Sequence, residues 1–410
     1  MSEDYFLSDS DSDDEILENS AALTFSMIIS NIVSKLRSPP INKFVIEEGR
    51  GFTFFMKALE YPELFRSEYR MYPSTYYALR NKLKPHYRPK TRLDFDSAFA
   101  LFLSFVSHNT SYRKLRYDFQ ASVAVIFTVI EQFLVLTVDI MWHEFVGMPE
   151  VSFEMARAQR LRITNPRLRK LYEVFDGAIA LVDGTVINCA FHGQNVNMRN
   201  YSEGWAVNMV IVTDLMGRFR AVGPGLGAEH DASIFRFRAA SVNIPEDTYL
   251  LADRGFGLAE RVMTGQKGTR FHVDLFTRGY KAPKSPKELY NRVHSSIRMY
   301  IERAFGQLKE TFPVLRYGRM SVTKLFLTVC SLICIHNFIR ETEGELQYDV
   351  VFSDEDLYDT LPSFDMTEEK LTMNPDFLPS DINTTTHKRA VLKRKAIEEK
   401  LWRVYQSITR

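Results

Sequence analysis

Residues 178–185 read AIALVDGT, and this stretch determines how the second half of the chain is interpreted. Its apolar start predicts a buried strand, and Asp183 follows that strand directly. The same pattern recurs in TYLLADRGF at residues 248–256, where Asp253 follows an apolar run. We therefore expect both carboxylates at the carboxyl ends of buried strands in an α/β fold.

A third acidic residue, Glu302, lies on a predicted helix in MYIERAFG at residues 299–306. Three carboxylates that meet against an apolar core would repel one another unless a positive charge joins them. Carboxylate oxygens are the ligands that Mg²⁺ or Mn²⁺ prefers, and two such ions about 3.5 to 4 Å apart activate a water and stabilise the leaving oxygen of a phosphodiester. The pattern thus predicts phosphoryl transfer on a nucleic acid.

Charge is unevenly distributed along the chain. The net charge of the 410 residues is only +1, but residues 1–20 carry eight acidic side chains and no basic one. Residues 21–340 carry 43 basic against 28 acidic side chains. A region this basic is expected to bind a polyanion. The alternative is that the acidic ends only offset the positive charge of a soluble protein. Three cysteines and an acidic, serine-rich start favour a reducing compartment over secretion.

The first 150 residues are predicted to form three segments. They are an acidic disordered tail at 1–20, a helical and basic segment at 21–92, and an all-α helix-turn-helix region at 93–150. In the second segment, KLKPHYRPKTR at 82–92 holds two prolines that favour an extended backbone. This run is either a strip that follows phosphates or a solvated linker.

The helix-turn-helix region lacks the usual base-reading side chains. Ser111 and Ser122 are predicted to cap its second and third helices. The third helix is almost wholly apolar and, because Glu131 interrupts the apolar stretch Val123–Ile140, we expect it to be buried and not to span a membrane. The better phosphate contacts lie on the second helix: Arg113, Lys114 and Arg116.

Residues 170–340 are predicted to form a ribonuclease H-like α/β core. The expected order is a strand, a hairpin that turns at Gly217, a helix from about Ala232 to Ala240, a second strand, and the long helix of residues 286–312. A final apolar helix at 321–341 should be central. An acidic linker at 341–385 and a basic amphipathic helix at 386–410 would follow, the latter with Leu392, Ile397, Leu401 and Val404 on its apolar side.

On the long helix, His294, Arg298, Glu302 and Gly306 are spaced by four and share one stripe, which we expect to face a site. Arg298 either holds the carboxylate of Glu302, meets a phosphate, or forms an ordinary surface ion pair. Gly306 is unfavourable within a helix by about 1 kcal/mol relative to alanine. Close approach of another backbone or of a DNA strand would explain it.

Five stretches together resemble the catalytic domain of the PIF/Harbinger transposases and the related Harbinger transposase-derived nuclease. They are VDGT, HDASIF, LADRGF, NRVHSSIRMYIERAFGQLKETFPVLR and IHNFIR. The resemblance implies a DDE endonuclease in which Asp183, Asp253 and Glu302 hold two Mg²⁺ or Mn²⁺ ions, cut double-stranded DNA and, in active transposases, join the freed 3′ hydroxyl to target DNA. It also implies a nuclear setting, with the cytoplasm as a second location, a homo-oligomer and a Myb-like partner protein.

Asp231 and several arginines remain open at this point. Asp231 matches the aspartate of the family's HD motif, which is sometimes counted among the metal ligands, but it also suits the N-cap of a small helix. Candidates for phosphate contact are Arg254, Arg292 and Arg298. A DNA-binding or protein-interaction module that keeps the fold without cutting is the main alternative function, and ribonuclease activity is a weaker one.

Overall fold

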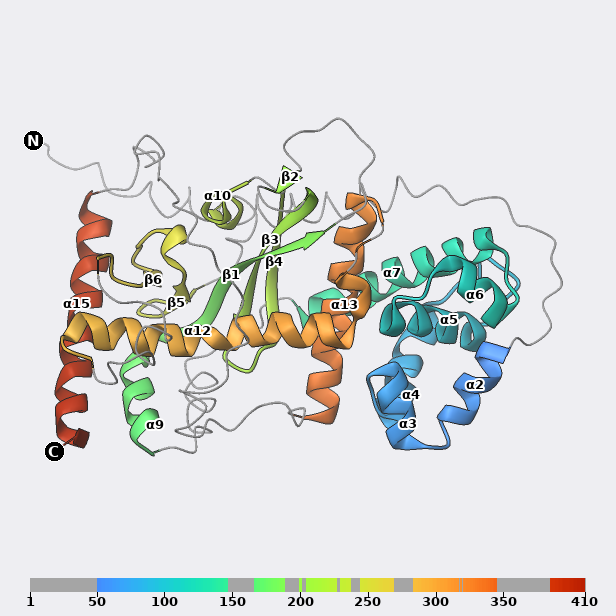
Figure 1. The fold of residues 1–410 in the computed structure, drawn as a ribbon, viewed down its shortest axis with the longest axis horizontal. Helices are drawn as coiled ribbons and strands as arrows, with labels where there is room; N and C mark the ends of the chain where they lie inside the picture. The colour runs from blue at the N-terminus through green and yellow to red at the C-terminus, as the bar shows by residue number, and fades with distance from the viewer. Residues whose placement is uncertain are drawn as a thin grey trace, which may run out of the picture.

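The computed structural model describes residues 50–146, 166–188, 199–200, 204–226, 229–236, 244–268, 283–316, 318, 320–344 and 384–409. A helical region lies at one end of the molecule, a sheet covered by helices occupies the middle, and the last helix lies at the other end (Figure 1). The predicted acidic tail, all of residues 21–49 and residues 345–383 of the predicted acidic linker lie outside the described residues.

The helical region is built from six α-helices within residues 50–146. They are α2 Arg50–Ala58, α3 Pro62–Tyr69, α4 Pro73–Leu83, α5 Phe95–His108, α6 Tyr112–Phe119 and α7 Val123–Phe145. Both predicted caps are confirmed: the hydroxyl of Ser111 accepts from the backbone of Lys114, and that of Ser122 from Val125. A dense cluster of aromatic rings, centred on Phe99 and Phe133, fills the core.

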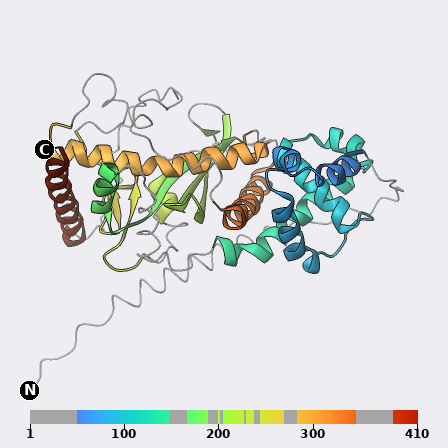
Figure 2. The ribbon, with the colours of Figure 1, turned by 90° about the horizontal axis from the view of Figure 1, so that it is seen from below.

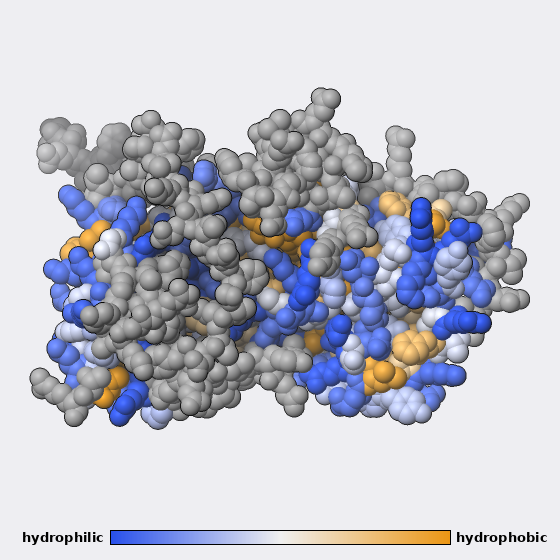
Figure 3. Space-filling view, viewed as in Figure 1, coloured by the Kyte–Doolittle hydropathy of each residue, from blue (hydrophilic) through white to orange (hydrophobic). Residues whose placement is uncertain are grey.

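The third helix of the predicted helix-turn-helix is a packing element. α7 lies against α5, α6 and α13 (Val322–Glu343), with its apolar side chains buried between them. α7 and α13 are long and apolar enough to span a membrane, and in this structure both pack within the protein core. The apolar sequence of α7 is therefore explained by helix packing. Phe54 of α2 and Leu64 of α3 remain exposed, and Figure 3 shows hydrophobic residues on the surface at this end of the molecule.

The basic run 82–92 is only partly extended, so the prediction of an extended strip needs correction. Residues Lys84–His86 form a short 3₁₀-helix directly after α4. Lys82 pairs with Glu144 at 2.6 Å, and Lys84 lies 3.2 Å from Asp96. These ammonium groups bind carboxylates of the helical region, which lowers their availability to phosphates.

The described strands form one six-stranded mixed sheet. They are β1 Ala178–Asn188, β2 Arg199–Asn200, β3 Gly204–Asp214, β4 Phe219–Leu226, β5 Tyr249–Ala252 and β6 Val262–Thr264. The order is β2-β3-β1-β5-β6, and β4 pairs with β3. β1 pairs antiparallel with β3 and parallel with β5, while β5 and β6 are parallel. Gly217, at φ +72°, turns the β3–β4 hairpin as predicted.

Both faces of the sheet are buried. Side chains alternate between the two faces along each strand, so each strand contributes to both cores. Val207, Met209 and Ile211 of β3 join the main core beneath α12 (Pro286–Thr311) and α13. Val210 and Val212 join a smaller core on the opposite face with Ile234 of the short helix α10 (Asp231–Ile234). Figure 2 shows α12 lying along one face of the sheet. A mixed sheet between helices, after an N-terminal helical region, is consistent with the predicted ribonuclease H-like core.

Two predicted boundaries need correction. β1 does not end at Asp183: it continues to Asn188, because β3 pairs with it as far as Asn188 and Ala206. The helix expected at about 232–240 is described only as α10, and residues 237–243 lie outside the described part. The long helix 286–312 and the central apolar helix are confirmed as α12 and α13.

The basic C-terminal helix packs on the α/β region. α15 (Thr384–Thr409) lies against α12 and α9 (Pro166–Tyr172). Leu401 is fully buried and Ile397 nearly so, as predicted for its apolar side. Leu392, however, is 65% exposed, so its assignment to that side is wrong. The reason is helical periodicity: nine residues separate Leu392 from Leu401, which places them on opposite sides of a helix with about 3.6 residues per turn, whereas Ala390 is buried.

Candidate functional site

The pairing of β1 with β5 places two of the predicted carboxylates side by side. Val182 of β1 is the direct partner of Ala252 of β5 in the parallel ladder. Asp183 directly follows Val182, and Asp253 directly follows Ala252. The two aspartates therefore lie at the same height along the two strands. β5 ends there, and the 3₁₀-turn Arg254–Phe256 carries the chain away. The end of the shorter strand opens space in front of Asp183.

Helix α12 brings Glu302 and Arg298 to the same place. The guanidinium of Arg298 donates from Nη2 to Asp183 Oδ2 at 2.7 Å. Its Nη1 lies 3.5 Å from Asp253 Oδ1, and Nη2 lies 3.9 Å from Glu302 Oε1. All three predicted acids therefore meet around one guanidinium group. The sequence patterns did not predict that Arg298 contacts all three.

The acidic cluster is buried at one end and open at the other. The side chains of Arg298 and Asp183 are 8% and 17% exposed, whereas those of Asp253 and Glu302 are 45% and 53% exposed. The pair of Asp183 and Arg298 is thus largely shielded from solvent, whereas Asp253 and Glu302 are accessible to it. Apolar neighbours of Glu302, such as Ile301 and Phe305, hold α12 against the core.

Burial and charge perturb the groups at the buried end. Desolvation raises the pKa of Asp183 to about 7; Arg298 opposes this rise, and Glu302 and Asp253 add to it. Burial alone would lower the pKa of Arg298, but the surrounding carboxylates raise it above its ordinary value. Strong perturbation by burial and a specific charge partner, at a partly open position, is typical of functional sites.

Asp231 lies against Gly184 of β1 and does not cap α10 with its side chain. The N-cap residue of α10 is His230, which makes no side-chain cap bond, and Asp231 is the first helical residue. Its Oδ1 instead accepts from Asn208 Nδ2 at 2.6 Å. The N-cap prediction is therefore wrong. A Cβ on Gly184 would lie 2.7 Å from Asp231 Oδ1, so glycine is what lets Asp231 approach β1.

The predicted phosphate-binding arginines divide into two groups. Arg254 and Arg298 lie at the cluster, and burial lowers the pKa of Arg254 while the charge of Asp253 raises it. Arg292 lies on the side of α12 that faces Tyr172, whose pKa it helps to lower against the larger effect of burial. The structure thus brings Arg292 to α9 instead of the carboxylates.

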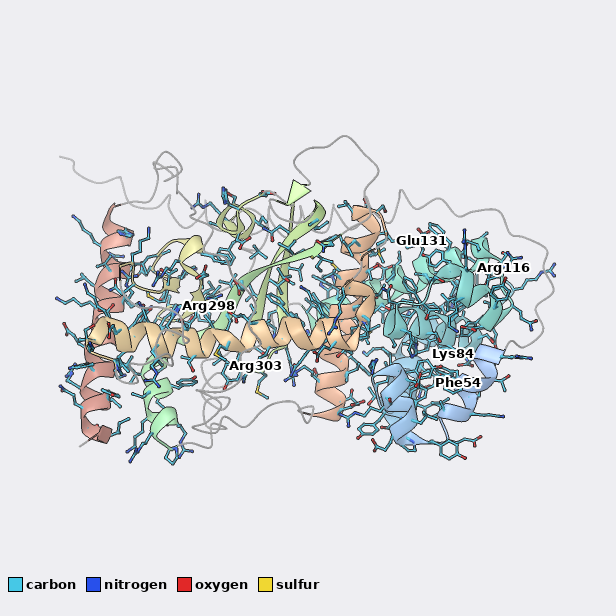
Figure 4. All side chains as sticks on the ribbon, in the orientation of Figure 1. Phe54, Lys84, Arg116, Glu131, Arg298 and Arg303 are labelled. Atoms are coloured by element: carbon cyan, nitrogen blue, oxygen red, sulfur yellow. The ribbon has the colours of Figure 1, made fainter. Side chains whose placement is uncertain are left out.

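The three basic residues of α6 are exposed at the far end of the molecule. Arg113, Lys114 and Arg116 all lie on the outer face of α6, and Lys114 pairs with Asp118 at 3.0 Å. Figure 4 shows Arg116 in the helical region, well separated from Arg298 on α12. These residues and the acidic cluster therefore form two separate sites on one molecule.

Two polar residues near the cluster were not identified from the sequence. Asn208 holds Asp231, and the signal was a lone buried amide within the apolar run of β3. Lys309 donates from Nζ to Thr185 Oγ1 at 3.0 Å and is largely buried. It lies seven residues after Glu302 on α12, so the helical stripe that carries Glu302 and Gly306 extends to it.

The donor chemistry of the cluster fits a divalent cation, but its present arrangement is built around Arg298. Carboxylate oxygens are suitable ligands for Mg²⁺ or Mn²⁺. Among the residues that the structure describes, however, no three His, Cys, Asp or Glu side chains are close enough together to hold a metal. The guanidinium lies between Asp183, Asp253 and Glu302 and satisfies their charge instead.

Comparison with known protein families supports the site at the level of a superfamily. Residues 182–337 match the family model of the DDE superfamily endonucleases. The matched range runs from β1 to α13 and includes Asp183, Asp231, Asp253 and Glu302. Neither the search of curated proteins nor that of solved structures found a match. Over this range the chain is therefore similar to DDE superfamily endonucleases, and the resemblance to the Harbinger group stays a prediction.

Proposed function

We propose that this protein is a metal-dependent DNA endonuclease that hydrolyses phosphodiester bonds at the acidic cluster. The observation that carries the proposal is the convergence of Asp183, Asp253 and Glu302 from two adjacent parallel strands and a helix around one cationic group. Acids this close are costly without a cation, and their open side faces solvent. The similarity to DDE superfamily endonucleases supports the same chemistry.

In this proposal the three acids are the ligands of two Mg²⁺ or Mn²⁺ ions. Bound there, such ions would activate a water and stabilise the leaving oxygen of the phosphodiester. Asp183 supplies the buried ligand, while Asp253 and Glu302 supply ligands at the solvent-exposed end. Asp231 contributes from beside Gly184, either as a further ligand or through its charge. In a second step of the same chemistry, a freed 3′ hydroxyl in place of water would attack a phosphodiester of target DNA, forming a new ester bond while the target strand's 3′ oxygen leaves.

DNA binding is proposed for the basic side chains outside the cluster. Arg254 lies next to Asp253 and could hold the scissile phosphate, since guanidinium groups bind phosphate with two hydrogen bonds. The exposed face of α6 would hold the duplex through its backbone: Arg113, Lys114 and Arg116. A homo-oligomer, a Myb-like partner and a nuclear location remain predictions from the sequence.

A nicking assay tests the proposal. The full chain is incubated with supercoiled plasmid and with several DNA ends in Mg²⁺, Mn²⁺ or EDTA. We expect nicking only with the divalent ion, and a loss of more than about a hundredfold in Asp183→Asn and Glu302→Gln, because each removes a proposed ligand. Glu310→Gln is the matched control, since Glu310 lies on the same helix, is 72% exposed and pairs with Arg316.

Two other functions are distinguished by the same assay. A folded protein that binds DNA but cuts none of these substrates in either metal would be a binding module that retains the fold. Faster cleavage of RNA than of DNA under the same conditions would identify a ribonuclease. Nicking by the wild type that persists in Asp183→Asn would place the chemistry elsewhere.

A further inference from the structure

The position of Arg298 raises a question that the proposed function does not answer. Its two terminal nitrogens contact Asp183, Asp253 and Glu302, and its side chain is 8% exposed. Its Nε has no hydrogen-bond partner among the residues that the structure describes. The guanidinium is therefore held at this depth by the carboxylates alone, at the place where a cation shared by all three would lie.

Charge balance makes Arg298 and divalent cations competitors. Three ionised carboxylates and one guanidinium leave a net charge of about −2, which one divalent ion neutralises. With a second ion the net charge would be about +2 while the guanidinium stays and about +1 once it withdraws, so its withdrawal lowers the repulsion. The position of the guanidinium points the same way, because Arg298 Nη2 lies 2.7 Å from Asp183 Oδ2 and within 3.9 Å of Glu302 Oε1, where a cation shared by these oxygens would lie.

The surroundings allow the guanidinium to withdraw. Arg298 precedes Glu302 by one turn of α12, and the cluster opens to solvent on the side of Glu302 and Asp253. An arginine side chain has enough rotatable bonds to move from the buried carboxylate to this open side. Asp183, which is nearly enclosed, has no comparable freedom, because its backbone is fixed in the ladder of β1 with β3 and β5.

We infer that Arg298 is the internal counter-ion of the acidic cluster in the metal-free protein, and that it must leave Asp183 before that carboxylate can bind a divalent cation. This inference rests on the proposed function, because it assumes that the cluster binds metal. It assigns Arg298 a role as a positioning residue that keeps the three acids together until a metal arrives. The same residue then limits how tightly the metal binds.

The test measures metal-dependent thermal stability, which needs no DNA and no cleavage. Melting temperatures of the full chain are recorded against increasing Mg²⁺ or Mn²⁺ for the wild type, Arg298→Gln and Arg303→Gln. Arg303 is the matched control: it loses the same charge from the same helix, and Figure 4 shows Arg298 and Arg303 on opposite sides of α12. Arg298→Lys is included in case the glutamine variant does not fold.

Removal of the competitor has two expected effects. Without metal, Arg298→Gln melts below both the wild type and Arg303→Gln, because three carboxylates lose their counter-ion. Its half-saturating metal concentration falls by about tenfold relative to the wild type, as for two coupled binding events. The half-saturating concentration of Arg298→Lys falls by less, because the ammonium group keeps the charge but cannot contact Asp183 and Asp253 in the same way. Arg303→Gln keeps the wild-type midpoint.

Other outcomes overturn the inference in distinguishable ways. An unchanged or higher midpoint in Arg298→Gln, or in Arg298→Lys if only that variant folds, would show that Arg298 does not compete with the metal. The proposed nuclease function would survive that result. No metal effect in any of the proteins, including the wild type, would remove both the inference and the metal-dependent function.

Discussion

Two glycines near the acidic cluster differ in the space around them. A Cβ would be crowded at one and unhindered at the other. At Gly184, a Cβ would overlap the carboxylate of Asp231, which must fit against β1 to reach Asn208. At Gly306, one turn after Glu302, a Cβ would meet no described heavy atom within 4 Å. Close approach of another described backbone therefore does not explain Gly306, and approach by a DNA strand stays a prediction.

Gly184→Ala is expected to destabilise the protein by about 1 to 3 kcal/mol, because the added methyl group displaces the carboxylate of Asp231 from a packed position. Urea unfolding measures the change in free energy. Nicking activity should fall as well, since Asp231 moves relative to Asp183. A variant with wild-type stability would mean that α10 shifts freely away from β1.

Gly306→Ala is expected to stabilise the protein by up to about 1 kcal/mol, because alanine favours the helical conformation and Gly306 is exposed within α12. If a DNA strand approaches this position closely, the same substitution weakens DNA binding. Thermal unfolding and a DNA titration of one sample separate the two effects. Lower stability would reveal a contact that the free protein needs, and unchanged DNA affinity would exclude the close approach.

At the scale of elements, Asn337 joins three parts of the fold. This buried residue of α13 donates from Nδ2 to the carbonyls of Phe145 at 2.8 Å and Phe219 at 2.7 Å. Its Oδ1 accepts from the backbone N–H of Phe219 at 3.0 Å. It thereby ties the end of α7 and the start of β4 to the central helix, and so connects the helical region to the sheet.

Asn337→Leu should cost about 3 kcal/mol or more in the free energy of unfolding. The leucine leaves three buried backbone groups of Phe145 and Phe219 without this partner, and each unpaired group costs about 1 to 3 kcal/mol. Chemical denaturation measures the loss. A change below about 0.5 kcal/mol would show that water or neighbouring side chains replace the amide.

At the scale of the whole molecule, Lys324 of α13 forms the second polar link to the helical region. Its Nζ donates to the hydroxyl of Tyr112 at 3.0 Å, lies 3.8 Å from Glu131 Oε1 and lies 3.8 Å from the centre of the Phe127 ring. Burial lowers the pKa of Lys324 to about 8, and the charge of Glu131 opposes that change. Burial of the charged ammonium group therefore lowers the stability of the folded protein near neutral pH.

Stability should depend on pH through this lysine. Between pH 8 and the pKa of about 10.4 in the unfolded chain, the unfolded state binds more protons than the folded state. The contribution of Lys324 to stability is thus lowest below pH 8 and rises with pH through this window. Relative to Lys324→Met, the wild type should gain about 2 kcal/mol between pH 7.5 and 9.5.

Denaturation of both proteins across this range checks the prediction, since most other titrating groups are common to them and cancel. Parallel stability profiles would mean that the lysine titrates alike in both states. A wild type that loses stability relative to Lys324→Met as the pH rises would show that the ammonium form is the favoured one in the folded protein.

Local interactions in the sequence determined the type of most elements, while some ends, such as that of β1, depended on pairing with distant strands. The caps Ser111 and Ser122, the turn at Gly217 and the helix that carries Glu302 could all be predicted, because each depends on neighbours within a few residues. Continuous apolar runs likewise predicted the strands before Asp183 and Asp253. These properties follow from backbone conformation and from side-chain periodicity.

Only the tertiary structure decided what these elements do together. Arg298 and Asp183 are 115 residues apart, and the parallel pairing of β1 with β5 determines whether their side chains meet. For the same reason the sequence could not show that Asp231 binds Asn208. Long-range contacts depend on strand register and helix packing, in which many weak interactions are satisfied at once.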